Sequence, residues 1–205
     1  MRAAHWEPKV WSLSWAFLLF LVVGTSNAVN LTDGIDGLAA GLCVEVGLVI
    51  AAISCWVAPM AASSRGGPSF DIGLFWGCLG GACLGFLAFN RHPARIFMGD
   101  TGSLALGAAL GAGAVAMRAV FLLPFIGFIF YVEMFSVIAQ VLYFKYTRKR
   151  FGEGKRLLRR APLHHHFELA GWGEWRVVLT FWGVNAVTSG LGLWLWWRGA
   201  LPVYP

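Results

Sequence analysis

The chain has 205 residues, of which 58% are hydrophobic and only 13% are charged, and its mean hydropathy is +0.67. Soluble domains carry about 25% charged residues, so this composition excludes an ordinary soluble domain and indicates an integral membrane protein. The net charge of +6 would suit a nucleic-acid partner, but the cations cluster in short segments between apolar runs. That pattern is typical of membrane orientation, and no nucleic-acid partner is expected. The four cysteines lie inside apolar runs and are interpreted as small hydrophobic residues.

Apolar runs long enough to cross a bilayer, about 20 residues each, lie at 11–30, 38–59, 72–90, 102–118, 119–146 and 177–197. The sequence therefore predicts an all-α, polytopic membrane protein with about six transmembrane helices, forming a single transmembrane domain over residues 1–205. The fifth run contains Pro124, Gly127 and Glu133, which favour a break or a kink. The first run has an alternative interpretation as a signal peptide with a cleavage site near Ala28.

The number of spans predicts which connections share a side of the membrane. Six spans place the connections at 31–37, 91–101 and 147–176 on one side, together with most of the cations. The other side has only Arg2, Lys9, Arg65, Arg118 and Arg198. Because Lys and Arg are retained in cytoplasmic loops, the first group of connections is predicted to face the cytoplasm.

Two acidic residues follow the first apolar run, in the segment Asn27–Gly37. Asp33 and Asp36 are three residues apart, so they share a face of a helical turn, and Asn30 precedes Asp33 by the same spacing. A cation relieves the repulsion between two close carboxylates, whether it is a metal ion or a lysine. The alternative is a ligand-free turn rich in Asp and Gly. The doubled pattern at a membrane surface favours a functional site.

A second polar segment, Asn90–Ser103, lies between two apolar runs and contains a single carboxylate, Asp100. An acid next to hydrocarbon is costly unless it is paired, hydrated or coordinated, which indicates a functional site. Three basic residues precede it and can receive phosphates: Arg91, His92 and Arg95. The alternative is that Asp100 or Thr101 only caps the helix that follows.

A third polar segment, Ala161–Glu168, follows a run of cations and contains the adjacent His164, His165 and His166. Three consecutive side chains cannot all face one point, so one or two could bind phosphate or donate a proton. A zinc site is not predicted, because no Cys or carboxylate lies at ligand spacing. The basic run has the alternative role of facing lipid headgroups.

Two series of glycines recur at four-residue spacing in the third and fourth apolar runs. They are Gly77, Gly81 and Gly85, and Gly107 and Gly111. Small residues at this spacing let transmembrane helices approach closely. We therefore expect both series to be helix-packing faces.

Carboxylates, glycine-rich backbone, cations and histidines on one membrane face together indicate Mg²⁺-assisted phosphoryl chemistry, because Mg²⁺ prefers one or two carboxylates plus phosphate oxygens. Three of the segments also resemble the phospho-N-acetylmuramoyl-pentapeptide-transferase (MraY) family of the polyprenyl-phosphate N-acetylhexosamine-1-phosphate transferase superfamily, also called glycosyltransferase 4. The resemblance rests on Asn27–Ala39, Phe97–Ala105 and Ala161–Glu168. The triple histidine after Ala-Pro-Leu points to this family within the superfamily.

The resemblance implies an enzyme that transfers phospho-MurNAc-pentapeptide from UDP-MurNAc-pentapeptide to undecaprenyl phosphate. The products would be lipid I and UMP, the cofactor Mg²⁺, and the pathway peptidoglycan biosynthesis. It further implies a multi-pass protein of the bacterial inner membrane that contacts membrane lipid, with its active-site loops in the cytoplasm. The full-length family is expected to form homodimers.

The resemblance also implies roles for individual residues. Asp100 would be the Mg²⁺ ligand. The catalytic residues would be Asp100, Asp33 and Asp36 in the acidic cluster, and His164 in the histidine motif. The remaining matches would bind substrate: Asn30, Gly34, Ile35, Asn90, Phe97, Gln140, Ala161, His165 and His166. Within that group, the ring of Phe97 would be available to stack on uracil.

One departure from the family concerns the earlier half of its fold. The family has an Asp-Asp pair on a cytoplasmic loop there, and this sequence contains no Asp-Asp. The chain thus resembles the C-terminal six of ten helices. Either it is a fragment, or its start was misassigned, or a second chain supplies the rest. Two alternatives follow: a transferase for another UDP-N-acetylhexosamine, or a catalytically silent module that lacks the Asp-Asp loop.

Overall fold

The structure is a computed structural model that describes the backbone of residues 8–62, 69–117 and 119–201, and the side chains of 14–55, 71–117 and 119–201. Within these ranges every regular element is a helix, which confirms the predicted all-α class. In chain order the helices are α1 (Pro8–Thr32), α2 (Leu38–Ala62), α3 (Ser69–Asn90), α4 (Gly99–Ala116), α5 (Leu123–Ile126), α6 (Phe128–Phe151), α7 (Leu163–Leu169) and α8 (Glu174–Trp197).

Five helices, α1, α2, α3, α6 and α8, are long and apolar enough to cross a membrane, so the chain is a multi-pass membrane protein. The fourth predicted span, 102–118, forms α4, an 18-residue helix that is not among these five. Its first turn is polar, with Asp100 and Thr101, and the helix contains five glycines. The cations at 2, 9, 65 and 118, which the predicted orientation used, have side chains outside the described residues.

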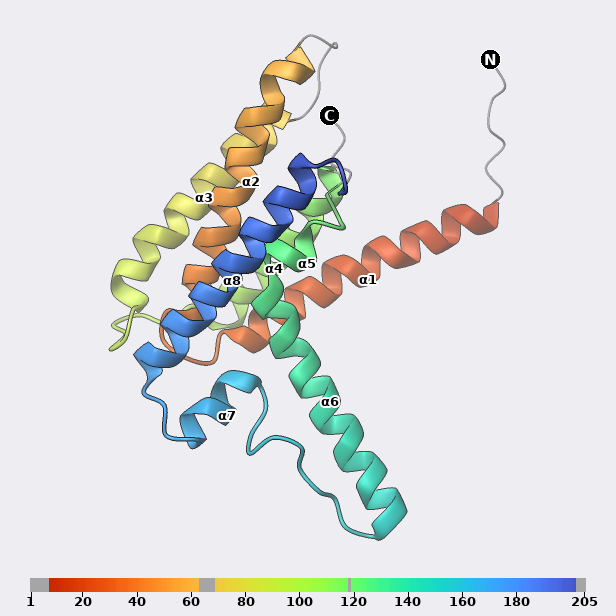
Figure 1. Ribbon diagram of the computed structural model, residues 1–205, viewed down its shortest axis with the longest axis vertical. Helices are drawn as coiled ribbons and strands as arrows, with labels where there is room; N and C mark the ends of the chain where they lie inside the picture. Colours follow the sequence, from red (N-terminus) through yellow and green to blue (C-terminus); the bar gives the residue numbers. More distant parts are fainter. Residues whose placement is uncertain (1–7, 63–68, 118, 202–205) are drawn as a thin grey trace.

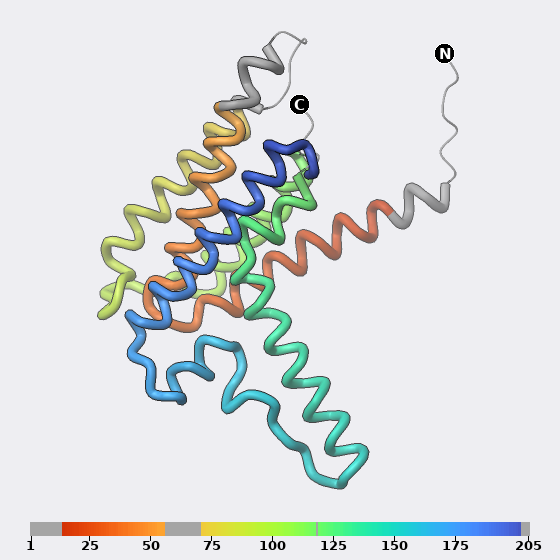
Figure 2. Tube along the Cα trace, in the orientation of Figure 1, coloured from red at the N-terminus to blue at the C-terminus, as the bar shows by residue number. Residues whose placement is uncertain are grey.

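The helices form a bundle from which two members diverge. Figure 1 shows α2, α3 and α8 running together, while α1 crosses at a steep tilt and packs against α4 and α6. The second half of α6 leaves the bundle, and the tube in Figure 2 returns from its end to α7 and then to α8. Leu142, Tyr146 and Phe151 on this part of α6 are exposed as a result. The α1–α2 connection, the α3–α4 connection and α7 lie at the same end of the bundle.

The predicted break in the fifth apolar run is confirmed between α5 and α6, at Gly127. The carbonyl of Ile126 accepts hydrogen bonds from Asn185 Nδ2 at 2.9 Å and from Ser189 Oγ at 3.3 Å. The backbone N–H of Ile129 donates to Asn185 Oδ1 at 3.3 Å. Two polar side chains of α8 therefore satisfy backbone groups that a break at membrane depth would otherwise leave unpaired.

The two glycine series behave differently. A Cβ at Gly107 would lie 2.6 Å from the Cα of Ser26, and one at Gly111 would lie 2.9 Å from the Cα of Val22, so this series is confirmed as the face that packs on α1. The prediction for Gly77, Gly81 and Gly85 is wrong for the described residues, because no atom lies within 4 Å of a Cβ built at any of them. The α3 glycines that approach α2 are instead Gly73, which lies against Ser54, and Gly80, which faces Gly47. Hydropathy does not fix the rotation of a helix that is apolar on every side.

Candidate functional site

A cavity of about 220 Å³ lies where the α1–α2 connection meets the start of α4. Its lining consists of Asp33, Gly34, Ile35, Asp36, Asn90, Phe97, Met98, Gly99 and Asp100. We call it the acidic cavity. It brings together the two carboxylates of the first predicted motif and the single carboxylate of the second, although about 60 residues separate these motifs along the chain.

Asp100 stands in the first turn of α4, which begins at Gly99 after Met98. The capping alternative is wrong, because Met98 is the N-cap and no side chain caps the helix. Asn30, in the last turn of α1, donates from Nδ2 to Asp100 Oδ1 at 2.9 Å and to Ser103 Oγ at 3.0 Å. Oδ2 of Asp100 has no hydrogen-bond partner among the described residues, so it is available to a ligand.

Asp33 lies in the turn that follows α1 and faces the same cavity. Burial, and secondly the negative charge of Asp100, raise the pKa of Asp33 from 3.8 to about 6. The negative charge of Asp100 beside the carboxyl of Asp33 creates a place for a cation. These donors are hard oxygens, the ligand type that Mg²⁺ prefers, so the residues present fit this metal.

Asn90 and Phe97 line the acidic cavity in different ways. Asn90 is 4% exposed, and its side chain accepts from the N–H of Gly37 at 3.1 Å and donates to the carbonyl of Ile96 at 3.0 Å. It therefore braces the α1–α2 connection against the α3–α4 connection. The ring of Phe97 is 78% exposed and is free to stack on a planar ligand.

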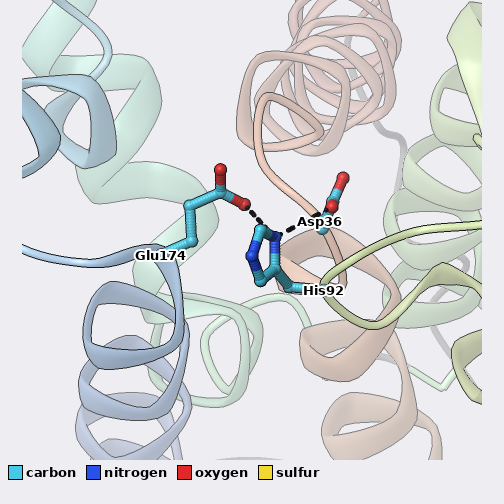
Figure 3. A group of neighbouring side chains, drawn as sticks. All are labelled: Asp36, His92 and Glu174. Carbon is cyan, nitrogen blue, oxygen red and sulfur yellow. Dashed lines mark hydrogen bonds and ion pairs between the residues drawn. The ribbon is translucent and has the colours of Figure 1, made fainter.

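Asp36, in the same turn, is held by two groups of the α3–α4 connection. Its Oδ2 accepts from the N–H of Ala94 at 2.9 Å and lies 3.2 Å from Nδ1 of His92. The same Nδ1 lies 2.8 Å from Oε2 of Glu174, so one imidazole faces carboxylates from two directions (Figure 3). The donor atoms of these three residues lie within 4.8 Å of one another. Sequence reasoning missed this pairing, because Glu174 stood in a run predicted as a connection.

His164 is completely buried under the acidic cavity, against Gly34. A Cβ at position 34 would collide with Nε2 of His164, so only glycine permits this approach. Glu133 of α6, also 0% exposed, accepts from the N–H groups of Leu163 at 2.6 Å and His164 at 3.1 Å. The carboxylate thereby fixes the start of α7. Nδ1 of the His164 ring lies 3.3 Å from Oε1 of Glu133, and neither ring nitrogen has a hydrogen-bond partner among the described residues.

From the sequence, Glu133 was interpreted only as a signal for a kink, and its hydrogen bonds to the histidine motif were not predicted. A carboxylate inside a predicted span was the available signal, because such residues are usually paired and functional. The other two histidines of the motif are half-buried and have partners of their own. His165 Nδ1 pairs with Glu168 Oε2 at 2.6 Å, and His166 Nδ1 accepts from the N–H of Arg159 at 3.1 Å.

Gln140 and Ala161, predicted for the nucleoside pocket, line a different cavity of about 400 Å³. Its cationic members are Arg156, Arg159 and Arg160. Gln140 Oε1 accepts from the N–H groups of Leu157 at 3.0 Å and Leu158 at 2.8 Å, so its amide shapes the loop. No residue is shared between the linings of the two cavities.

Comparison with known proteins assigns the chain to a family. The sequence model of glycosyl transferase family 4 matches residues 5–118, which is more than half of the chain. The chain belongs to glycosyl transferase family 4. The match includes both carboxylate motifs and the whole lining of the acidic cavity.

Similar individual proteins cover almost all of the chain. A phospho-N-acetylmuramoyl-pentapeptide-transferase of Geobacillus thermodenitrificans (strain NG80-2) is 48% identical over 198 residues, or 94% of this chain and 56% of the relative. The protein of the same name from Synechococcus sp. (strain JA-3-3Ab) is 49% identical over 94% of this chain and 52% of the relative. One from Listeria welshimeri serovar 6b is 50% identical over 83% of this chain and 48% of the relative. The chain thus spans about half the length of the curated relatives it matches.

Proposed function

We propose that the chain carries the metal and nucleotide half of a phospho-N-acetylmuramoyl-pentapeptide-transferase. The observation that supports this most is the acidic cavity, where Asp33 and Asp100 face each other beside the exposed ring of Phe97. The names of relatives that are about half identical to the chain supply the substrate class. The donor would be UDP-MurNAc-pentapeptide and the acceptor undecaprenyl phosphate, at the cytoplasmic face of the bacterial inner membrane.

In the proposed reaction an oxygen of the acceptor phosphate bonds to the sugar-linked phosphorus of the donor. The bond from that phosphorus to the bridging oxygen breaks, and UMP leaves with the electron pair. Mg²⁺, held by Asp100 with Asp33 beside it, would neutralise charge on the phosphate oxygens. The protein mainly positions the reactants, as in other phosphoryl transfers.

Each neighbouring residue has a positioning task in this proposal. Asn30 orients Asp100 through its amide, and the ring of Phe97 stacks on uracil. Asn90 keeps the two connections together, so that Gly34 and Ile35 form the floor beside the base. His164, locked by Glu133, supports that floor from below, while the half-buried His165 and His166 lie nearer to solvent.

The test is Mg²⁺-dependent release of UMP by membranes that contain this chain together with the N-terminal half of the Geobacillus relative. UDP-MurNAc-pentapeptide and UDP-GlcNAc are compared as donors, with undecaprenyl phosphate as the acceptor. The proposal expects release from the first donor only. Release from UDP-GlcNAc alone would assign another hexosamine. No release, where the full-length relative is active in the same membranes, would favour a silent module.

A further inference from the structure

A second hollow, of about 350 Å³, lies where α3 ends and α8 begins. Its lining consists of Ala88, Phe89, Arg91, His92, Pro93, Arg95 and Trp175, none of which lines the acidic cavity. We call it the arginine hollow. All three basic residues that the sequence offered as phosphate receivers for the Asp100 site, Arg91, His92 and Arg95, therefore line a different space.

The arginine hollow carries positive charge that nothing else in the described chain neutralises. Arg91 and Arg95 are exposed, and neither makes an ion pair with a described residue. The carboxylates nearest to the hollow, Asp36 and Glu174, are both directed at Nδ1 of His92. Nε2 of that ring has no partner among the described residues, so the hollow offers two guanidinium groups and an imidazole nitrogen. Guanidinium forks match phosphate oxygens in geometry and charge.

The rest of the lining places the hollow at the level of lipid headgroups. It sits at the ends of two membrane-spanning helices, and Trp175, 42% exposed, belongs to the first turn of α8. Tryptophan is enriched at the membrane–water interface, and basic residues there attract anionic lipids. Ala88 and the half-exposed Phe89 supply an apolar wall, which a site for a soluble anion does not need.

The surface of α3 beyond the hollow is open. Phe89 follows Gly85, Gly81 and Gly77 at four-residue steps, so these residues share a face of the helix. No atom lies within 4 Å of a Cβ built at any of the three glycines. A hydrocarbon chain has a smooth path there from the hollow into the bilayer. This face shows where the hydrocarbon chain of a bound lipid would run.

We infer that the arginine hollow is a binding site for an anionic glycerophospholipid, with its phosphate on Arg91 and Arg95. The site is separate from the proposed transferase site, and its ligand is a lipid that is neither donor nor acceptor. The lipid would tether the α3–α4 connection, which holds Asn90, Phe97 and Asp100, to the bilayer surface.

The experiment is native mass spectrometry of the delipidated full chain, released from mixed micelles that contain equal amounts of phosphatidylglycerol and phosphatidylcholine. The comparison uses the double variant Arg91→Gln/Arg95→Gln and a matched control, Arg148→Gln/Arg150→Gln, which removes two exposed cations at the end of α6. Thermal unfolding of all three proteins establishes that they are equally folded, as expected for exposed side chains.

The wild type and the control should retain phosphatidylglycerol in preference to phosphatidylcholine. The double variant should bind it on the order of tenfold more weakly, because each basic residue near the surface contributes to anionic-lipid binding. Equal losses in the two variants would mean diffuse charge attraction and would overturn the site. Displacement of phosphatidylglycerol by inorganic phosphate or by undecaprenyl phosphate at a comparable concentration would also overturn it.

This binding measurement contains no nucleotide and no acceptor during the variant comparison, so it is independent of the proposed transferase activity. A chain that binds phosphatidylglycerol through Arg91 and Arg95 but releases no UMP would refute only the proposed function. A chain that releases UMP without this lipid preference would refute only the inference.

Discussion

The acidic cavity and the histidine motif lie on opposite sides of Gly34, yet their polar groups are in contrasting states. Asp100 is exposed and keeps one carboxylate oxygen free among the described residues. Glu133 and His164 are 0% exposed, and both carboxylate oxygens of Glu133 accept backbone N–H groups. Free polar atoms at an opening are suited to binding a ligand, whereas a buried carboxylate whose two oxygens are paired holds a shape. We therefore propose that the chemistry belongs to the acidic cavity and that Glu133 positions α7.

The largest expected effect on stability comes from the buried region. Glu133→Ala should lower the free energy of unfolding by about 3 kcal/mol, because it leaves two buried N–H groups and the His164 ring without their carboxylate. Unfolding by SDS in mixed micelles measures this. Glu153→Ala, at an exposed position in the following connection, is the control and should change little. Equal effects of the two substitutions would show that Glu133 is not a structural anchor.

The contact between the two regions is tested at Gly34. Gly34→Ala should cost about 1–3 kcal/mol, because the added methyl group collides with the His164 ring and must displace either the ring or the turn. The same unfolding assay applies. Gly24→Ala is the matched control in α1, where a Cβ meets no atom within 4 Å. An unchanged stability in Gly34→Ala would mean that the turn and α7 are not packed together.

The positioning of Asp100 is tested at Asn30. Asn30→Ala should weaken Mg²⁺ binding by about 10- to 100-fold, because residues that orient a metal ligand typically contribute this much. Isothermal titration of the detergent-solubilised chain with Mg²⁺ measures the affinity. Asn27→Ala provides the control, since the Asn27 amide donates only to the carbonyl of Val23 in its own helix. Similar affinities in the two variants would remove Asn30 from the site.

The smallest effect is the pH dependence that Asp33 introduces. Its pKa is raised from 3.8 to about 6 in the folded chain, so the folded state binds more protons than the unfolded state between these values. Stability should therefore fall as the pH rises from about 4 to about 6, and then stay level. The fall in stability should be on the order of 1 kcal/mol, because the side chain is partly screened by solvent. Asp33→Asn should remove it. A fall of the same size in the variant would assign it to other groups.

The order of the helices and the location of the two carboxylate motifs could be predicted from the sequence. Apolar runs mark the spans, and Pro124 with Gly127 marks the break between α5 and α6. The motif residues Asp33 and Asp100 were expected in one site because both connections fell on one side of the membrane. The structure places them in one cavity.

The pairings of buried and interfacial polar groups could not be predicted. One of the two partners of His92, Glu174, is 82 residues away, and Glu133 is 31 residues from His164, counted from the sequence numbers. Such pairs depend on the rotation of each helix, and helices that are apolar all round give no period from which to read it. The open face at Gly77, Gly81 and Gly85 was mispredicted for the same reason.

The central claim is that the acidic cavity holds the metal of a phosphoryl transferase, and Asp100→Asn tests it most directly. The measurement is Mg²⁺-dependent UMP release by this chain together with the N-terminal half of the Geobacillus relative, with Asp71→Asn at an exposed position of α3 as the control. Asp100→Asn should lower the rate by at least about 100-fold, because loss of a ligand exceeds the usual effect of losing its support. The control should keep its rate. Activity of Asp100→Asn equal to that of the control would contradict the claim.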